Sequence, residues 1–128
     1  MKKTPNVPAY RNPSAPPASR VKDLLKRMTL EEKAAQMMCL WQEKATKLLD
    51  QNGNFDPQKA KESFKKGHGI GQVGRPSDSG GGKDARSMAA LTNEIQKFFM
   101  ENSRLGIPVI FHEECLHGHS APGGTSFS

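Results

Sequence analysis

Residues 112–119 read HEECLHGH and bring three histidines, two glutamates and one cysteine into eight positions. The segment directly follows an almost continuous apolar run, IPVIF at 107–111, which is typical of a strand that is buried on both faces. In parallel α/β sheets and barrels, residues just beyond the carboxyl end of a strand line the ligand site. The position of this segment therefore indicates a ligand site, and its residue types suggest metal or carbohydrate chemistry.

A metal site is the first possibility for this segment. The helical zinc pattern needs His112 and a second histidine four positions later, but Leu116 stands there. If the segment stays extended, alternation places four potential ligands on one face: Glu113, Cys115, His117 and His119. Gly118 disfavours such a long extended run. We therefore expect no metal ion here.

The two neighbouring glutamates suggest carbohydrate chemistry. A retaining glycosidase needs two carboxyl groups about 5 Å apart on opposite sides of the sugar. Glu113 and Glu114 follow each other on a strand end, so their side chains diverge and cannot be that pair. One of them could still bind a sugar, because an ionised carboxylate accepts hydrogen bonds from two adjacent hydroxyls. A loop carboxylate that pairs with a lysine explains the same spacing.

The sequence gives weaker support for a nucleotide site or a nucleic-acid site. GIGQVG at 69–74 matches the dinucleotide glycine pattern, but a polar helix precedes it and a glycine-rich loop follows, whereas the pattern needs a strand before and a helix after. The formal net charge is +6, yet the basic residues are mixed with acidic ones and no aromatic residues interleave with them. We expect solvated helix faces and no nucleic-acid partner.

The elements that must position residues 112–119 begin with an N-terminal arm. Residues 1–18 contain five prolines and predict an extended, polyproline-like segment. Ser19 is the expected N-cap of a first helix, and Thr29 with Glu32 forms a capping box for a second. The second helix is expected to bury a stripe of apolar side chains: Leu30, Ala34, Met37, Met38 and Trp41.

A strand–helix–strand unit is expected to follow. Asp56 and Pro57 open a short helix that ends at Gly67, and residues 67–74 predict a short buried strand. An amphipathic helix then runs from Asp84 to about Ser103 and leads into the 107–111 strand. The two strands must be parallel, with a right-handed crossover, and a parallel pair is not a whole sheet.

These residues resemble a known family. YRNPSAPPASRVKDLLKRMTLEEKAAQM, GHGIGQVGRPS and NEIQKFFMENSRLGIPVIFHEECLHGHSAPGGTSF are together similar to the opening of glycoside hydrolase family 3, the β-glucosidase and β-xylosidase group. The similarity extends over residues 10–127. It implies an α/β fold in which residues 19–128 are the first part of a (β/α)8 TIM-type barrel, incomplete, with about two barrel strands and their preceding helices.

The resemblance also implies a function and its residues. The family uses a retaining, cofactor-free mechanism on β-linked glycosides, with an aspartate nucleophile and a glutamate acid/base that both lie later than this segment. No catalytic residue is therefore assigned here. Glu114 matches the family's sugar-binding acid, where many members have aspartate, and His117 matches the adjoining His-Gly element. The extra methylene of Glu114 is expected to crowd a hydroxymethyl group and favour pentosides.

Composition suggests that this chain is a marginal domain or a piece of one. It has 128 residues, of which 34% are apolar and 6% aromatic, so little apolar area is available to offset the entropy of ordering. Isolated, it is expected to be aggregation-prone and inactive. The alternatives are a small non-enzymatic module that binds sugar or metal through HEECLHGH, and a basic interaction domain. No signal peptide or membrane span is visible, so the default location is cytoplasmic, with export of a parent protein left open.

Overall fold

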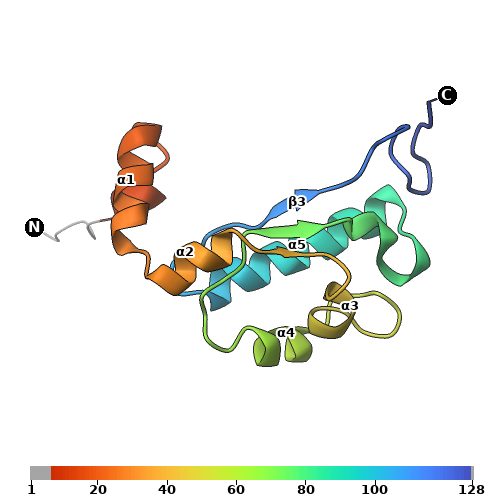
Figure 1. Ribbon diagram of the computed structural model, residues 1–128, viewed down its shortest axis with the longest axis horizontal. Helices are drawn as coiled ribbons and strands as arrows, with labels where there is room; N and C mark the ends of the chain where they lie inside the picture. The colour runs from red at the N-terminus through yellow and green to blue at the C-terminus, as the bar shows by residue number, and fades with distance from the viewer. Residues whose placement is uncertain (1–6, 128) are drawn as a thin grey trace, which may run out of the picture.

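The computed structural model describes residues 7–127, and its centre is a parallel sheet of three short strands (Figure 1). The strands are β1 (Cys39–Leu40), β2 (Gln72–Gly74) and β3 (Ile110–His112), in the order β1-β2-β3. Cys39 is in register with Gln72, and Gln72 with Ile110. The predicted α/β class is confirmed. The sheet has one strand more than the two expected.

The predicted strand–helix–strand unit is present as β2, α5 (Ala85–Asn102) and β3. The side chain of Asp84 caps α5 by accepting a hydrogen bond from the Ser87 amide at 2.8 Å. One face of α5 is buried and supplies Leu91, Ile95, Phe98 and Phe99 to the core. Burying this face against Val73 and Leu40 holds the parallel strands together, because a crossover helix must cover the sheet that it connects.

The second helix is shorter than predicted. The capping box of Thr29 and Glu32 is confirmed, but α2 (Leu30–Gln36) ends before the methionines, and the next residues form β1. Gly71 lies so close to the helix end that an added Cβ would stand 2.0 Å from the carbonyl oxygen of Gln36. The amides of Gly71 and Gln72 donate to Ala35 and Met38, which draws the chain out of the helix. All five side chains of the expected buried stripe are exposed, Met37 by 86%, so the prediction that this stripe is buried is wrong.

The N-terminal arm also differs from the prediction. Residues 1–6 of the expected arm lie outside the described residues. Residues 9–11 form a 3-10 helix, η1 (Ala9–Arg11), and α1 (Pro17–Arg27) begins at Pro17, not after Ser19. Proline suits this first helical position because its missing N–H has no partner to lose there. The Tyr10 hydroxyl donates to the Leu105 carbonyl at 3.1 Å and thereby ties the arm to the end of α5.

Two short helices complete the layer beneath the sheet. They are α3 (Lys44–Lys47) and α4 (Pro57–Ser63), and Asp56 caps α4 as predicted. Phe64 packs edge-on against Phe99 at 4.8 Å between ring centroids. Figure 1 shows α3, α4 and α5 on the same side of the sheet. Between β2 and α5 the loop forms a further 3-10 segment, η2 (Pro76–Gly81), where a simple loop was expected.

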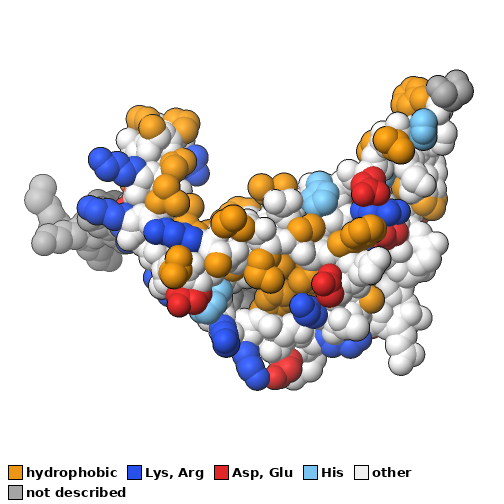
Figure 2. All heavy atoms as spheres, in the orientation of Figure 1, with side chains coloured by type: hydrophobic (Ala, Val, Ile, Leu, Met, Phe, Trp, Pro, Cys, Tyr) orange, Lys and Arg blue, Asp and Glu red, His pale blue; other side chains and the backbone are white. Residues whose placement is uncertain are grey.

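The opposite face of the sheet is open. Ile110 is 64% exposed, so the expectation that the last strand is buried on both faces is wrong for the described residues. In Figure 1, α1 and the C-terminal loop rise at either end of this face, and Figure 2 shows hydrophobic side chains along α1 and across the hollow between them. The exposed large hydrophobic residues of α1 and β3 include Val21, Leu25 and Ile110.

An ion pair with one buried partner joins α2 to the segment that follows α5. Glu32 is 2% exposed, and Arg104, which follows α5, donates to its carboxylate from Nε at 2.7 Å. The same guanidinium donates to the Arg27 carbonyl at the end of α1. The hydrogen bond from Arg104 lowers the pKa of Glu32 below its ordinary value of 4.5, against the opposing effect of burial. Because the folded-state pKa is depressed, this stabilisation is present above about pH 4.5 and is lost as the pH falls through the folded-state pKa.

Replacing Glu32 with glutamine tests this pair. Glu32→Gln should lower the free energy of unfolding at pH 7 by roughly 2 kcal/mol, since the charge-assisted pair with Arg104 is lost, whereas glutamine can still serve the capping box. The difference from the wild type should shrink as the pH is lowered below 4.5, measured by thermal unfolding. Glu62→Gln is the control, because Glu62 pairs with Lys65 on the open surface. An equal loss in both variants would contradict the role of Glu32.

Candidate functional site

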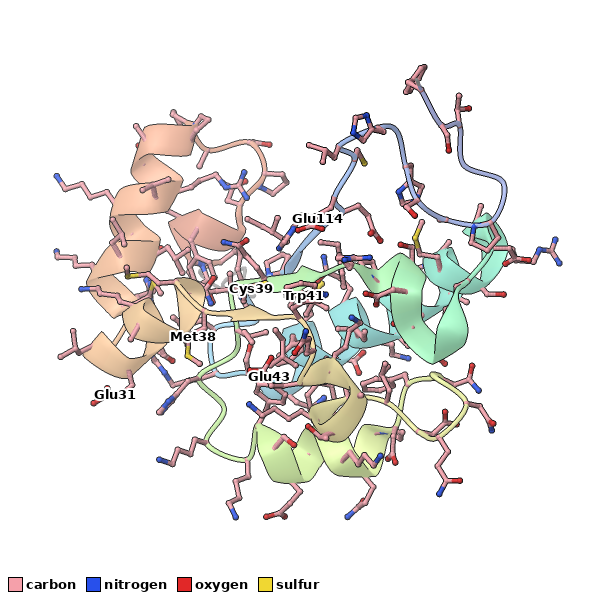
Figure 3. The ribbon with its side chains drawn as sticks, turned by 45° about the vertical axis from the view of Figure 1, so that its right-hand side comes forward. Glu31, Met38, Cys39, Trp41, Glu43 and Glu114 are labelled. Atoms are coloured by element: carbon pink, nitrogen blue, oxygen red, sulfur yellow. The ribbon has the colours of Figure 1, made fainter. Side chains whose placement is uncertain are left out.

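Polar side chains from all three strands meet at one edge of the sheet. Trp41 directly follows β1, Arg75 follows β2, and Glu113 and Glu114 follow β3. The strands are parallel, so their carboxyl ends share the same edge, where ligands bind in α/β proteins. Figure 3 shows Cys39, Trp41 and Glu114 together in this region. We call Trp41, Arg75, Asp78 and Glu114 the edge cluster.

Glu113 holds the strand end in place. Its carboxylate accepts hydrogen bonds from the backbone amide and the hydroxyl of Ser77, both at 2.8 Å. Ser77 is buried in η2, so Glu113 satisfies an amide and a hydroxyl that would otherwise be desolvated without partners. Both carboxylate oxygens are engaged, and we assign Glu113 to structure.

Glu114 points to a different partner, as expected from strand alternation. Its side chain is 68% exposed, and Nη1 of Arg75 donates to its Oε2 atom at 3.3 Å. The sequence left open that this carboxylate pairs with a lysine. In the structure its partner is an arginine. One carboxylate oxygen remains open to solvent-borne hydroxyl groups, which is what sugar binding requires. Glu113 thus anchors the strand end, and Glu114 remains an exposed hydrogen-bond acceptor.

His117 lies beside Glu114 in a shallow hollow. The hollow has a volume of about 320 Å³ and is lined by Arg75, Glu114, Leu116, His117, Gly118, Ser120 and Ser126. A neighbouring hollow of about 560 Å³ lies between η2 and residues 119–122 and shares Ser120 and Ser126 with the first. The structure therefore brings both predicted binding residues, Glu114 and His117, to one concave surface. Their roles in binding stay predictions.

The extended four-ligand arrangement does not form. Glu113 is committed to Ser77, and Gly118 has a φ of 95°, which breaks the alternation that the arrangement needs. Within residues 7–127, no three His, Cys, Asp or Glu side chains gather as metal ligands would. Two Cys–His contacts remain: Cys39 with His112 at 3.3 Å and Cys115 with His119 at 3.9 Å. Gly74 allows the first contact, since an added Cβ would stand 3.0 Å from the His112 ring.

Sequence reasoning missed Trp41 and Arg75. Trp41 was assigned to a helix, although it follows a strand, and Arg75 was placed in a flexible loop. The one signal for Arg75 is its position directly after the predicted 67–74 strand, the same kind of position that drew attention to residues 112–119. Within the described residues, no helix is long and apolar enough to span a membrane.

Removing the Glu113 carboxylate tests its anchoring role. In Glu113→Ala, the Ser77 amide and hydroxyl lose their partners, at a cost of about 2 kcal/mol. Amide hydrogen exchange of residues 75–79 should accelerate by at least tenfold, since a tenfold change corresponds to about 1.4 kcal/mol. Glu94→Ala, on the exposed side of α5, is the control and should leave the exchange of these residues unchanged. Unaltered exchange in Glu113→Ala would count against the anchor.

Comparison with known proteins gives sequence relatives over a short region. No protein-family model matches the chain. It is 36% identical over 119 residues to a Formosa agariphila protein named "Putative beta-xylosidase", an alignment that spans 92% of this chain and 15% of the relative. The chain therefore spans only about 15% of that relative's length.

Solved structures of β-glucosidases share the fold. A b-glucosidase from Erythrobacter marinus, EmGH1, is similar with a TM-score of 0.66 and 33% identity, over 89% of this chain and 14% of that one. A Listeria innocua beta-glucosidase, solved in complex with glucose, has a TM-score of 0.50 and 24% identity over 77% of this chain and 13% of its own, which shows likeness of fold alone. Family 3 membership stays a prediction, because none of these names states it. The chain is similar, in sequence and fold, to a small part of β-glycosidases.

Proposed function

We propose that this chain is the opening part of a retaining, exo-acting β-glycosidase of the β-glucosidase or β-xylosidase type, belonging to glycoside hydrolase family 3. The observation that carries this proposal is Glu114, an exposed carboxylate at the carboxyl edge of a parallel sheet, in the pattern acid, two residues, His-Gly. The likeness to the Formosa agariphila and Erythrobacter marinus proteins supports it. A (β/α)8 barrel, of which β1 to β3 are a part, is the proposed fold of the whole domain.

Glu114 is proposed to bind the substrate and not to cleave it. Its free carboxylate oxygen can accept hydrogen bonds from two adjacent hydroxyl groups of the terminal sugar. His117 lines the same hollow and is proposed to shape the loop around that sugar. The nucleophile and the acid/base are assigned to no residue of this chain, so substrate binding here must be combined with chemistry supplied from elsewhere in the protein.

The length of the Glu114 side chain suggests the substrate class. Glutamate extends one methylene further than the aspartate that many family members have, so its carboxylate should reach into the space of a hydroxymethyl substituent. A pentoside such as a β-xyloside lacks that substituent. We therefore propose β-xylosides and short β-linked xylo-oligosaccharides as the preferred substrates.

The protein at its natural length should be assayed with aryl β-xyloside and aryl β-glucoside. The wild type should have the higher kcat/KM on the xyloside, and Glu114→Asp should move the ratio toward the glucoside by roughly tenfold, the effect of one methylene in a tight pocket. Glu94→Asp, on the exposed side of α5, is the matched control. A strong glucoside preference in the wild type would reject the pentoside assignment, and activity on neither glycoside would reject the function.

The isolated 128-residue chain provides a separate test. Strands β1 and β3 each pair on one side only, which leaves backbone groups open at both edges of the described sheet. We expect the isolated chain to aggregate readily and to hydrolyse no glycoside. If the isolated chain is soluble and binds zinc or xylo-oligosaccharides saturably, the non-enzymatic binding module is favoured. If it binds DNA in a salt-sensitive manner, the basic interaction domain is favoured.

A further inference from the structure

The backbone of Arg75 is held in an unfavourable conformation. Its φ is 50° and its ψ is 58°, the left-handed region, and within residues 7–127 every other residue with positive φ is a glycine. For a residue with a Cβ this region is unfavourable, and it persists only where the surrounding contacts fix it. The Arg75 amide donates to the His112 carbonyl at 2.7 Å, which fixes the backbone between β2 and β3.

The guanidinium of Arg75 contacts three other side chains. Its central carbon lies 5.5 Å from the centroid of the Trp41 ring, a cation–π distance. Its Nε atom lies 3.4 Å from Oδ2 of Asp78, and its Nη1 atom is 3.3 Å from Oε2 of Glu114. A planar guanidinium with donors in a fixed fork is suited to such simultaneous contacts, and a lysine ammonium is not.

Two of the residues that contact Arg75 are in turn held by Lys44. Lys44 has a side chain only 6% exposed, and its Nζ atom pairs with Oδ1 of Asp78 at 2.6 Å. The same Nζ donates to the Trp41 carbonyl at 3.2 Å. Lys44 therefore connects the backbone of Trp41 to the Asp78 carboxylate that contacts Arg75. Of the edge cluster, only Glu114 projects into solvent without such an anchor.

We propose that Arg75 is the positioning residue of the sugar site and that it holds the Glu114 carboxylate in its binding orientation. This inference rests on the proposed function. A glutamate on an exposed loop would otherwise populate several rotamers, and ordering it at the moment of binding would cost affinity. The Arg75 contact engages Oε2, and Oε1 is then the acceptor for a ligand hydroxyl group. The substrate class that this geometry serves is a β-pentoside, because a restrained glutamate cannot fold away from a hydroxymethyl group.

Arg75→Gly is the decisive variant. Glycine adopts a φ of 50° without strain, so the substitution removes the guanidinium and relieves the backbone. In the protein at its natural length, kcat/KM for aryl β-xyloside should fall at least tenfold, and the preference for xyloside over glucoside should decrease. Arg75→Lys should also lose activity, because one ammonium cannot make the three contacts. Arg86→Ala, on the exposed start of α5, should leave both values unchanged.

Coupling to Glu114 separates positioning from a general structural effect. Arg75→Gly should cost little further activity in a Glu114→Ala background, since the group to be positioned is already gone. Free guanidinium at millimolar concentration should restore part of the activity of Arg75→Gly, but not that of Glu114→Ala or of the double variant. This rescue requires a vacant place between Trp41 and Glu114.

The outcomes distinguish the inference from the proposed function. Wild-type activity with an unchanged Arg75→Gly variant, or with equal losses in both Glu114 backgrounds, would overturn the positioning role and leave the glycosidase proposal standing. A wild type that hydrolyses neither glycoside would overturn the proposed function and this inference with it. Loss of activity, coupling to Glu114 and rescue by guanidinium together would support both.

Discussion

The parallel alignment of three strands is the constraint on which the rest of this structure depends. Parallel strands cannot be joined by a tight turn, so each return must cross the sheet through a helix or a long loop. The buried face of α5 provides that return between β2 and β3, with Ile95 and Phe99 packed in the core. As a result, the strands end at one edge, and residues 41, 75 and 114 meet there although up to 73 positions separate them (114 − 41).

Local signals were sufficient to predict the elements whose boundaries have a local cause. The capping box at Thr29, the Asp56 cap and the α5 face each depend on residues within a few positions of one another, and all three are confirmed. The stripe that includes Met37 and Trp41 has helical spacing, yet the helix ends at Gln36 and residues 39–40 form a strand. That outcome is caused by pairing with residues 71–73, more than thirty positions away, and a tertiary contact of this kind leaves no periodicity in the sequence.

The candidate site was predictable in part for the same reason. The segment 112–119 could be found because it follows an obvious apolar run, and the resemblance to glycoside hydrolase family 3 pointed to Glu114 within it. Arg75 follows a strand of three residues, and nothing in its own type indicates a left-handed backbone, which sequence reasoning expects of glycine. Its contacts with Trp41 and Glu114 join three strand ends, so they become visible only once the order of strands in the sheet is known.

Strand alternation explains why two adjacent glutamates contact different partners. Successive side chains at the end of β3 point to opposite sides, so Glu113 faces η2 and finds the buried Ser77 amide, while Glu114 faces the open side. The anchored glutamate fixes the backbone from which the exposed one projects, and Arg75 reaches that exposed carboxylate from the neighbouring strand end. A carboxylate restrained from both its backbone and its tip loses less freedom when a ligand binds than a mobile one. Under the positioning role proposed for Arg75, the carboxyl ends of these strands would present a carboxylate acceptor that is ordered before a ligand binds.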